Sequence, residues 1–462
     1  MKRETCSTQK HTFDSSNNSY HVELESIQYV DEIEIHWNFR YEYKYEIEIS
    51  LDSIHWVKLS KGEYVSSDLV SRNIIRANTG YIRIKLADQS ADRFSEAMKH
   101  VLVYSGTAAE FIKGVDVSHL TQIEDFGGKF YDRQGRERDC LEILKEYGCN
   151  YVRLKVWNKP GLPNSDPAGY NDKAHVLGMA KRAVDKGYRL LIDFHYSDWW
   201  ADPGKQFIPD DWKDLSLEQL NTALYDFTYE VLNGLKLQGT LPEMVQIGNE
   251  ITNGMLWDVA KVSDEFDTPE QWDKLCTLLK SGISAVKAIS ESIRTVIHIE
   301  RGGDNEKSCY FYDMLAERNV AYDIIGLSYY PIWHGPIKDF SSNIKDLYDR
   351  YSKEILVAEV AYPYTAENGD DQLNASSFLF TNIPEEYPPS IQSQADILQA
   401  VIYELKSIPD NKGIGFFYWQ PDFIPVKGAG WKYGEGCEWD DQTLFDFKGN
   451  TLWSLDVFKL HS

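Results

Sequence analysis

The chain has 462 residues, which is more than one ordinary hydrophobic core accommodates and therefore predicts two domains. Its formal net charge of −24 argues against nucleic acid as a partner, because an acidic surface repels phosphate backbones. No apolar run approaches the roughly 20 residues of a membrane-spanning helix, and the six cysteines include no C-x-x-C pair, which argues against zinc and leaves one disulfide open.

The first region, from about residue 20 to 105, alternates apolar and polar residues with a period of two. This period is typical of half-buried antiparallel strands, so residues 1–107 are predicted to form a small all-β sandwich domain. A short stretch near Phe94–His100 has a helical period instead. The alternating segments are HVELESIQYV, EIEIHWNFRYEYKYEIEIS, HWVKLS and YIRIKLA.

From about residue 110 onward, short apolar segments alternate with helix-length segments. This order indicates βα units and a parallel sheet, and it predicts an α/β (β/α)₈ TIM barrel over residues 108–462. A doubly wound open sheet is the alternative, but no G-x-G-x-x-G turn follows any of these segments. The eight predicted strands are 111–118, 151–157, 189–196, 244–250, 295–300, 323–331, 354–363 and 413–421.

Most of these predicted strands begin with apolar residues and end with polar ones. In a (β/α)₈ barrel the carboxyl ends of the strands and the loops after them form the active face. A strand buried on both faces has no structural reason to end in a carboxylate, so the repetition over seven strands favours a catalytic site. The residues at these ends are Asp116, Ser118, Arg153, His195, Asn249, Glu250, Tyr330, Glu359 and Trp419.

Glu250 and Glu359 are the best candidates for a pair of catalytic carboxyl groups. Glycoside hydrolysis with retention uses two carboxyl groups about 5–5.5 Å apart, one as nucleophile and one as acid and then base. Glu250 follows Asn249, which is placed to hydrogen-bond a sugar 2-hydroxyl, and an ionised neighbour would keep Glu250 protonated. Glu250 is therefore predicted to be the acid/base and Glu359 the nucleophile.

A nucleophilic carboxylate needs a fixed cation and hydrogen-bond donors to stay ionised. Arg153 is permanently charged, Tyr330 can donate through its hydroxyl, and Ser328 shares the strand face of Tyr330 by period two. These residues are therefore predicted to lie near Glu359.

Other carboxylates compete for a place in the predicted cleft. Asp193 lies two residues before His195 and is expected either to support that imidazole or to be a satisfied buried group. Asp198 and Asp202 follow the third strand and are expected to line the cleft, and Asp116 is expected to support it from behind. A metal mechanism is less favoured, because His195 has no close histidine partner and no H-E-x-x-H occurs.

Tryptophan side chains follow or end several predicted strands, and some are expected to stack on sugar rings. The alternative for any one of them is packing within a loop. Trp419 is the best candidate for the floor of the sugar site, and Trp199 and Trp333 are expected to line it. The full set is Trp157, Trp199, Trp200, Trp257, Trp333 and Trp419.

At these positions the second region closely resembles the endo-β-1,4-galactanases of glycoside hydrolase family 53, over about residues 110–455. The matching motifs, in order, are FIKGVDVS, GCNYVRLKVWNKP, LLIDFHYSDWWADPGKQ, VQIGNEITNGMLW, IIGLSYYPIWHG, AEVAYPYT and GIGFFYWQP with WDDQTLFDFKG. The resemblance implies retaining, endo-acting cleavage of β-1,4-galactan in type I arabinogalactan. It also places the acid/base on Glu250 and the nucleophile on Glu359.

Further expectations concern cofactors, partners and location. No cofactor is needed for the chemistry, the partner is the polysaccharide, and a monomer is expected. The polar stretch Met1–Tyr20 lacks a signal-peptide core, so the protein is either cytoplasmic or begins after a removed export signal. The resemblance favours export to the periplasm, the cell surface or the medium.

The chain departs from the family pattern at two places, and one loop raises the question of a metal. Gln420 stands where the family has Glu, and Trp439-Asp440-Asp441-Gln442 replaces W-x-N-Q, which puts outer-subsite preference in doubt. Bacterial members carry calcium in the loop after strand seven. Here a structural Ca²⁺ competes with a solvated acidic turn, and its oxygen ligands would be Asn368, Asp370, Gln372 and Asn374, with Gln372 standing where relatives use His.

The first region resembles a discoidin-type domain through YEIEISLDSIHWVKLSKGEY, YIRIKLAD and VLVYSG. Such domains sometimes bind sugars, and a docking or spacer role is the default expectation. Two alternatives to galactanase activity remain for the whole chain: another barrel glycosidase such as a β-1,4-mannanase or cellulase, and a carbohydrate-binding protein that has lost catalysis.

Overall fold

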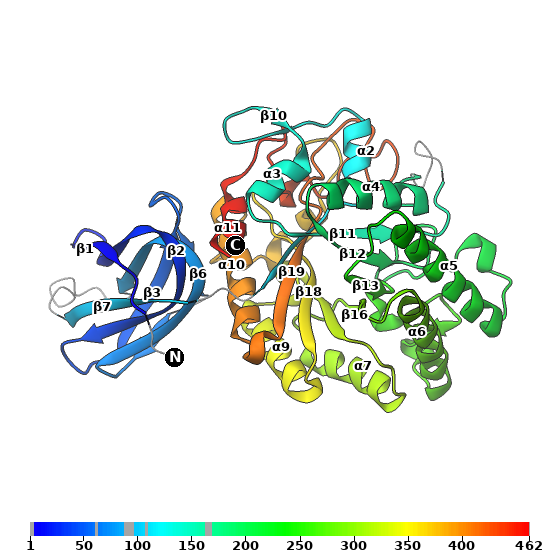
Figure 1. Ribbon diagram of the computed structural model, residues 1–462, viewed down its shortest axis with the longest axis horizontal. Helices are drawn as coiled ribbons and strands as arrows, with labels where there is room; N and C mark the ends of the chain where they lie inside the picture. The colour runs from blue at the N-terminus through cyan, green and yellow to red at the C-terminus, as the bar shows by residue number, and fades with distance from the viewer. Residues whose placement is uncertain (1–3, 61–62, 87–96, 107–109, 162–168, 462) are drawn as a thin grey trace.

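The computed structural model describes residues 4–60, 63–86, 97–106, 110–161 and 169–461. An all-β N-terminal part lies beside a (β/α)₈ barrel (Figure 1). The fold class predicted from the sequence is therefore confirmed. The predicted domain boundary at residue 107 falls in 107–109, outside the described residues. Among the residues the structure describes, no helix is both long and apolar enough to cross a membrane.

The N-terminal part is a seven-stranded antiparallel sheet in which two long strands carry the others. β1 pairs with the first part of β2, and β7 pairs with its second part, so different strands extend the sheet along the two halves of β2. Register shifts in the β2–β6 ladder lie between these two halves. The strands are β1 (Thr8–Asp14), β2 (Ser19–Trp37), β3 (Tyr43–Ser50), β4 (Val57–Lys58), β5 (Tyr64–Ser66), β6 (Val70–Leu86) and β7 (Met98–Ser105).

The alternation in the sequence is the alternation of burial in these strands. Along β6 buried residues alternate with exposed or half-buried ones over most of the strand, and Ala77, Ile82 and Ile84 are fully buried. Of the stretch with a helical period near Phe94–His100, residues 94–96 lie outside the described residues, Ala97 is helical, and Met98–His100 begin β7 and pair with β2. Cross-strand pairing overrides a short local period.

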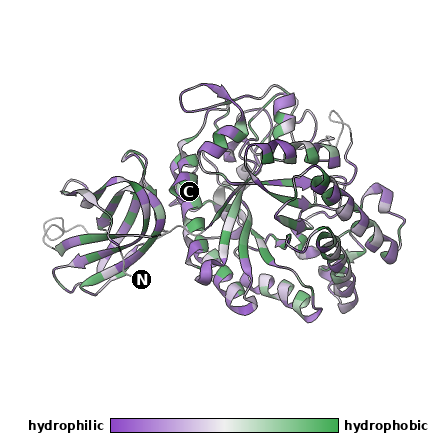
Figure 2. Cartoon of the chain, viewed as in Figure 1, coloured by the Kyte–Doolittle hydropathy of each residue, from purple (hydrophilic) through white to green (hydrophobic). Residues whose placement is uncertain are grey.

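The eight parallel strands of the second region close into a barrel in the order β11-β12-β13-β16-β17-β18-β19-β8. Each of the predicted strands is present. Hydrophobic colour dominates the barrel strands, and hydrophilic colour covers the outer turns of the helices (Figure 2). The strands are β8 (Ile112–Asp116), β11 (Tyr151–Val156), β12 (Arg189–Phe194), β13 (Met244–Ile247), β16 (Arg294–Ile299), β17 (Ile324–Ser328), β18 (Glu354–Val360) and β19 (Gly413–Trp419).

Helices surround the barrel and begin at residues that cap them. Ser216 forms a capping box with Gln219, and Asp139, Asp172 and Thr268 each accept a hydrogen bond from a backbone N–H of the first turn. The longer helices are α3 (Cys140–Glu146), α4 (Lys173–Asp185), α5 (Leu217–Leu237), α6 (Pro269–Ile289), α7 (Asn305–Glu317), α9 (Ile337–Tyr351) and α10 (Ile391–Ser407). The short ones are α2 (Leu120–Asp125), α8 (Pro331–His334) and α11 (Asp456–Leu460).

Apolar side chains fill the lower barrel, so its polar residues are confined to the carboxyl ends of the strands. These apolar residues form a cluster of their own inside the barrel. They are Ile112, Tyr151, Leu191, Met244, Val296, Ile324, Leu356, Ile414 and Phe417. The packed interior gives the mouth a rigid base on which the polar strand ends are held.

The sandwich contacts the barrel through α10. Asp396 on α10 accepts a hydrogen bond from the backbone N–H of Lys58 (3.0 Å), and Gln392 donates to the carbonyl of Trp56 (2.7 Å). His55 stacks on Trp453 with ring centroids 4.9 Å apart.

The six cysteines are buried free thiols, so the disulfide left open by the sequence is not formed.

Candidate active site

Glu250 and Glu359 meet at the mouth of the barrel. Glu359 lies within β18, and Glu250 follows β13 in a left-handed backbone conformation with φ of 48°. A non-glycine residue held in this region costs free energy, and such residues gather at active sites. Carboxylate oxygens of the two residues lie within 4.8 Å of each other. This separation fits the close pair of a retaining enzyme and is shorter than the roughly 6.5–9.5 Å of an inverting one.

Glu359 is held by a cation and a hydroxyl. Its Oε1 lies 2.9 Å from Nη2 of Arg153, and its Oε2 accepts a hydrogen bond from the hydroxyl of Tyr330 at 2.9 Å. Burial raises the pKa of Glu359 to about 7, and Arg153 and Tyr330 oppose that rise. Both contacts favour the ionised form that a nucleophile needs.

Glu250 has a neutral partner and a negative neighbourhood. The hydroxyl of Ser328 donates to its Oε1 at 2.6 Å. Burial raises the pKa of Glu250 well above its ordinary value, and the charges of Glu359 and Glu300 raise it further. Because the contact of Ser328 occupies Oε1, a proton on Glu250 belongs on Oε2, where it can be given to a leaving group.

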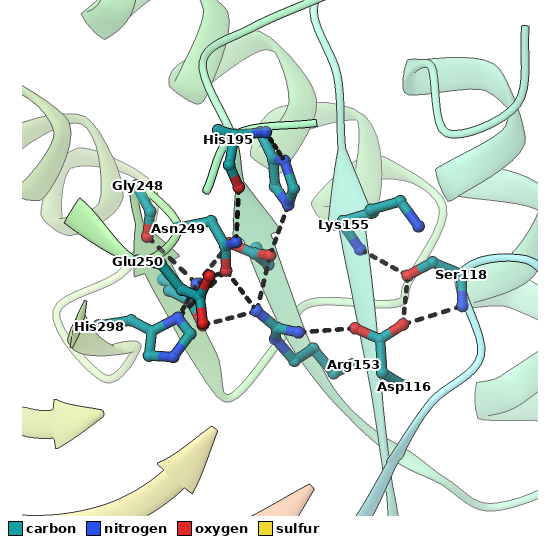
Figure 3. Close-up of polar contacts among 12 residues, drawn as sticks. Asp116, Ser118, Arg153, Lys155, His195, Gly248, Asn249, Glu250 and His298 are labelled. Atoms are coloured by element: carbon teal, nitrogen blue, oxygen red, sulfur yellow. Dashed lines mark hydrogen bonds and ion pairs between the residues drawn. The ribbon is translucent and has the colours of Figure 1, made fainter. Parts of the chain in front are cut away.

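Arg153 connects Glu359 to Asp116, Asp193 and Asn249, and Figure 3 shows Arg153 between Asp116 and Asn249. Its Nη1 lies 2.8 Å from Oδ2 of Asp116, and its Nη2 lies 2.9 Å from Oδ2 of Asp193 and 2.8 Å from Oδ1 of Asn249. The guanidinium is only 1% exposed, so water does not screen these contacts. Asp116 therefore supports the site from behind, as the sequence suggested, by fixing Arg153.

The amide of Asn249 is oriented by groups on three strands. Its Oδ1 accepts from Arg153 and from Gln246 Nε2 (3.0 Å) and lies 3.1 Å from Nδ1 of His298, and its Nδ2 donates to the carbonyl of Ala201 (2.9 Å). One hydrogen on Nδ2 remains for a substrate. This geometry supports the predicted contact with a sugar hydroxyl.

His298 and Ser328 link Asn249 to Glu250. Nε2 of His298 contacts Oγ of Ser328 at 2.9 Å, and the Ser328 hydroxyl in turn donates to Glu250. Sequence reasoning missed His298, although it is the single ionisable side chain among apolar residues in TVIHI, which is the signal that could have found it. Burial lowers the pKa of His298 well below its ordinary value, so the ring is neutral.

His195 is neutral and lies against the cleft. Its Nδ1 accepts from the backbone N–H of Ala201 (3.1 Å), which leaves Nε2 to donate to Asp193 (3.1 Å). Of the two roles weighed for Asp193, the contacts show support for His195 together with Arg153.

The two glutamates open into a cleft of about 550 Å³. Of the predicted residues, Trp199, Trp333, Trp419 and Asp202 line it. Trp200, another of the tryptophans considered for stacking on sugar rings, lines it too, whereas Trp157 and Trp257 do not. The sequence did not single out several other residues that line the cleft, which include Lys155, Lys205, Glu300, Trp431, Lys432, Glu438 and Trp439.

Asp198 does not line the cleft, which differs from the expectation. Its carboxylate accepts hydrogen bonds from the backbone N–H groups of Lys159 (2.9 Å) and Asp210 (2.8 Å). It therefore joins two loops. A short loop residue satisfies nearby backbone donors first, and residue spacing alone does not reveal which donors those are.

The two departures from the family pattern lie below the cleft surface. Gln420 is fully buried, and its Nε2 lies 2.8 Å from Nδ1 of His119. Asp440 and Asp441 are buried as well, and burial raises the pKa of each to about 7. Neither departure lines the cleft, where Trp439 lies instead.

The loop predicted to hold calcium is closed by its own hydrogen bonds. Asn374 Nδ2 donates to Asn368 Oδ1 (2.9 Å) and to Asp440 Oδ1 (2.8 Å), and Asp370 accepts from the backbone of Gln372 (2.7 Å) and Cys437 (2.8 Å). Asn374 Oδ1 is buried without a hydrogen-bond partner.

The barrel matches one family model and is similar to several named proteins. Residues 112–458 match the model of glycosyl hydrolase family 53. The endo-beta-1,4-galactanase of Bacillus subtilis (strain 168) is 34% identical, covering 83% of this chain and 93% of that protein. The arabinogalactan endo-beta-1,4-galactanase of Cellvibrio japonicus is 33% identical, covering 76% of this chain and 90% of that protein.

Two solved structures are also similar to the barrel of this chain. The GH53 catalytic domain of Ignisphaera aggregans is 43% identical with a TM-score of 0.71, covering 77% of this chain and 97% of that chain. A fungal beta-1,4-galactanase is 28% identical with a TM-score of 0.64, covering 76% of this chain and 99% of that chain. The chain belongs to glycosyl hydrolase family 53, and it is a glycoside hydrolase.

Proposed function

We propose that this enzyme cleaves β-1,4-galactosidic bonds within galactan, with retention of configuration. The galactanases among its relatives support the substrate. The observation that carries the proposed mechanism is the pair of carboxylates within 4.8 Å, one bound to Arg153 and the other to a neutral serine. Two carboxyl groups with such different partners suit two different roles.

The reaction has two steps. In the first, Glu359 attacks C1 of the glycone sugar while Glu250 gives its proton to the leaving oxygen, which yields a glycosyl-enzyme. In the second, Glu250 takes a proton from water as that water attacks C1 and releases Glu359. Asn249 holds the 2-hydroxyl during both steps.

Removing each carboxyl group separately tests these roles. With an aryl galactobioside that has a good leaving group, Glu250→Ala should accumulate glycosyl-enzyme, because leaving-group departure needs no acid while deglycosylation needs the base. Mass spectrometry should detect the adduct on Glu359, and azide should restore turnover. Glu359→Ala should form no adduct. An adduct in Glu359→Ala, or equal activity of either variant and wild type on galactan, would refute the assignment.

A substrate panel separates the remaining alternatives. Linear galactan, β-1,4-mannan and cellulose differ in hydroxyl configuration, so products from galactan alone support the proposal. Release of internal fragments before monosaccharide supports endo action. Galactan binding without any product over a day would instead support a carbohydrate-binding protein.

We also propose a structural calcium ion at the loop from 368 to 374. In its support, Asn374 Oδ1 is a buried acceptor without a partner, and Asp440 and Asp370 lie close enough for the charge of Asp370 to raise the pKa of Asp440. Of the four ligands predicted from the sequence, Asn368, Asp370 and Asn374 would hold the ion, whose role would be structural. Asp440 would take the place of Gln372, whose side-chain amide donates to Oε1 of Glu438 at 3.3 Å.

The remaining proposals concern the whole chain. Residues 1–107 form a separate domain, either a spacer or a carbohydrate-binding module, and a chain starting at residue 108 should remain active on soluble galactan if this boundary holds. Since a polysaccharide does not cross a membrane, we place the enzyme outside the cytoplasm, which cell fractionation tests. Light scattering tests the proposed monomer.

A further inference from the structure

Lys155 is a buried lysine beside the active site that the mechanism above does not use. It lies two residues after Arg153 on β11, so both side chains point into the barrel mouth. Its residue is 2% exposed, and it lines the cleft. A buried lysine at such a place needs an explanation, because taking a charged or polar group out of water costs free energy unless it is paired.

The protein supplies few partners for the amino group of Lys155. Nζ lies 3.2 Å from Nδ1 of His119, and Nε2 of Gln420 approaches the same nitrogen at 2.8 Å. Lys155 and Gln420 thus compete for the one lone pair of this ring nitrogen, and Nζ also lies 3.5 Å from Nε2 of His119. Among the described residues, no carboxylate lies within 4.0 Å of Lys155, whereas Arg153 contacts three of them.

Aromatic rings form the rest of the surroundings. Nζ lies 4.2 Å from the ring centroid of Trp200. Trp200, Trp419 and Trp431 stand 5.8–6.1 Å from one another by ring centroid, and all three line the cleft. Aromatic walls with a few polar groups between them are typical of a site for one sugar ring. Burial lowers the pKa of Lys155 to about 7, so an oxygen acceptor in the cleft would favour its ammonium form.

The position of Lys155 relative to Glu250 indicates which sugar it meets. Figure 3 shows Glu250 and His298 on one side of Arg153, and Lys155 with Ser118 on the other. Glu250 must lie beside the leaving oxygen, so the glycone sugar, whose C1 is attacked, extends away from it. Asn249 takes the 2-hydroxyl, and O4 carries the next sugar in a β-1,4 chain. The 3- and 6-hydroxyls are therefore left for other donors.

We propose that Lys155 is a specificity-determining residue that donates hydrogen bonds to the 3- or 6-hydroxyl of the glycone sugar. This inference rests on the proposed galactanase function. A site built to bind a hydroxyl through a buried donor rejects the analogue that lacks it, because the donor is then left unpaired. His119 and Gln420 orient the donor from below.

The test uses aryl β-galactobiosides in which the sugar carrying the aryl group lacks its 3- or 6-hydroxyl. Wild type should lose about 10–100-fold in kcat/KM on one of these analogues. Lys155→Met should lose a similar factor on the complete substrate and show no further loss on that analogue. Lys113→Met, at a buried lysine on β8 that does not line the cleft, is the control and should discriminate as wild type does.

Three outcomes would overturn the inference. The first is wild type that accepts both analogues as well as the complete substrate, a result that needs no variant to fold. The second is a folded Lys155→Met enzyme with unchanged kcat/KM on galactan. The third is a variant that loses activity but keeps the discrimination of wild type, which would show a purely structural role. If wild type does not cleave galactan at all, the proposed function fails instead.

Discussion

Replacing Tyr330 with Phe removes one hydrogen bond to the nucleophile and nothing else of similar size. The hydroxyl donates to Oε2 of Glu359 at 2.9 Å inside a buried site. A hydrogen bond to a charged group contributes about 1.5–3 kcal/mol, and one pKa unit corresponds to about 1.4 kcal/mol. The Phe variant should therefore raise the pKa of Glu359 by about 1–2 units from its value of about 7.

The sign of the pH effect follows from the role of Glu359. A nucleophile acts when deprotonated, so a higher pKa means that activity is lost at higher pH as the solution is acidified. The acidic limb of kcat/KM against pH should move upward by about 1–2 units, and the rate at the optimum should fall about 10–100-fold. Initial rates on soluble galactan from pH 4 to 9 measure both.

Tyr329→Phe is the matched control, because it removes the same hydroxyl group from the tyrosine that precedes Tyr330 in the sequence. Tyr329 is fully buried, and its hydroxyl donates to the carbonyl of Gly335 at 2.9 Å, away from the glutamates. This variant should keep the acidic limb of wild type. Coincident acidic limbs for Tyr330→Phe and wild type would refute the claim that Tyr330 keeps Glu359 ionised.

Three further predictions concern the acid, the loop and the domains. Ser328→Ala removes a donor that lowers the pKa of Glu250, so the alkaline limb should move to higher pH; an unmoved limb would contradict the contact. Because Asp440 ionises only near pH 7, millimolar calcium should raise Tm by a few degrees at pH 8 and less at pH 5, as differential scanning fluorimetry with an EDTA control can measure. A chain of residues 108–462 should match the full chain within about twofold in kcat on soluble galactan, since the cleft lies in the barrel; a large loss would assign the sandwich a role in catalysis.

The barrel could be predicted because its strands carry two independent signals. Parallel strands are buried on both faces and therefore appear in the sequence as short apolar runs. The change from apolar to polar residues marks the carboxyl end of each strand. The runs at 151–157 and 189–196 match β11 and β12 to within two residues at each end. The sandwich was harder, since β2 continues through residues 19–37 across register shifts that alternation does not reveal.

Contacts between strands could not be predicted in the same detail. Asp198 and Asp202 look alike in HYSDWWADPG, yet only Asp202 lines the cleft, because backbone donors at Lys159 and Asp210 hold Asp198 elsewhere. Gln420 looked like a residue of the cleft mouth and is buried against His119. The direction of a side chain at a strand end depends on the partners it finds in other loops, and one sequence does not contain those distances.

The two glutamates have different roles because Arg153 contacts one of them and not the other. Its guanidinium contacts three carboxylates, those of Asp116, Asp193 and Glu359, and its partners do not include Glu250. A single buried positive charge shared by three carboxylates leaves excess negative charge, which disfavours a further ionised group nearby. Glu250 is that further group, and its hydrogen-bond partner is the neutral hydroxyl of Ser328. The proton of the pair therefore belongs on Glu250.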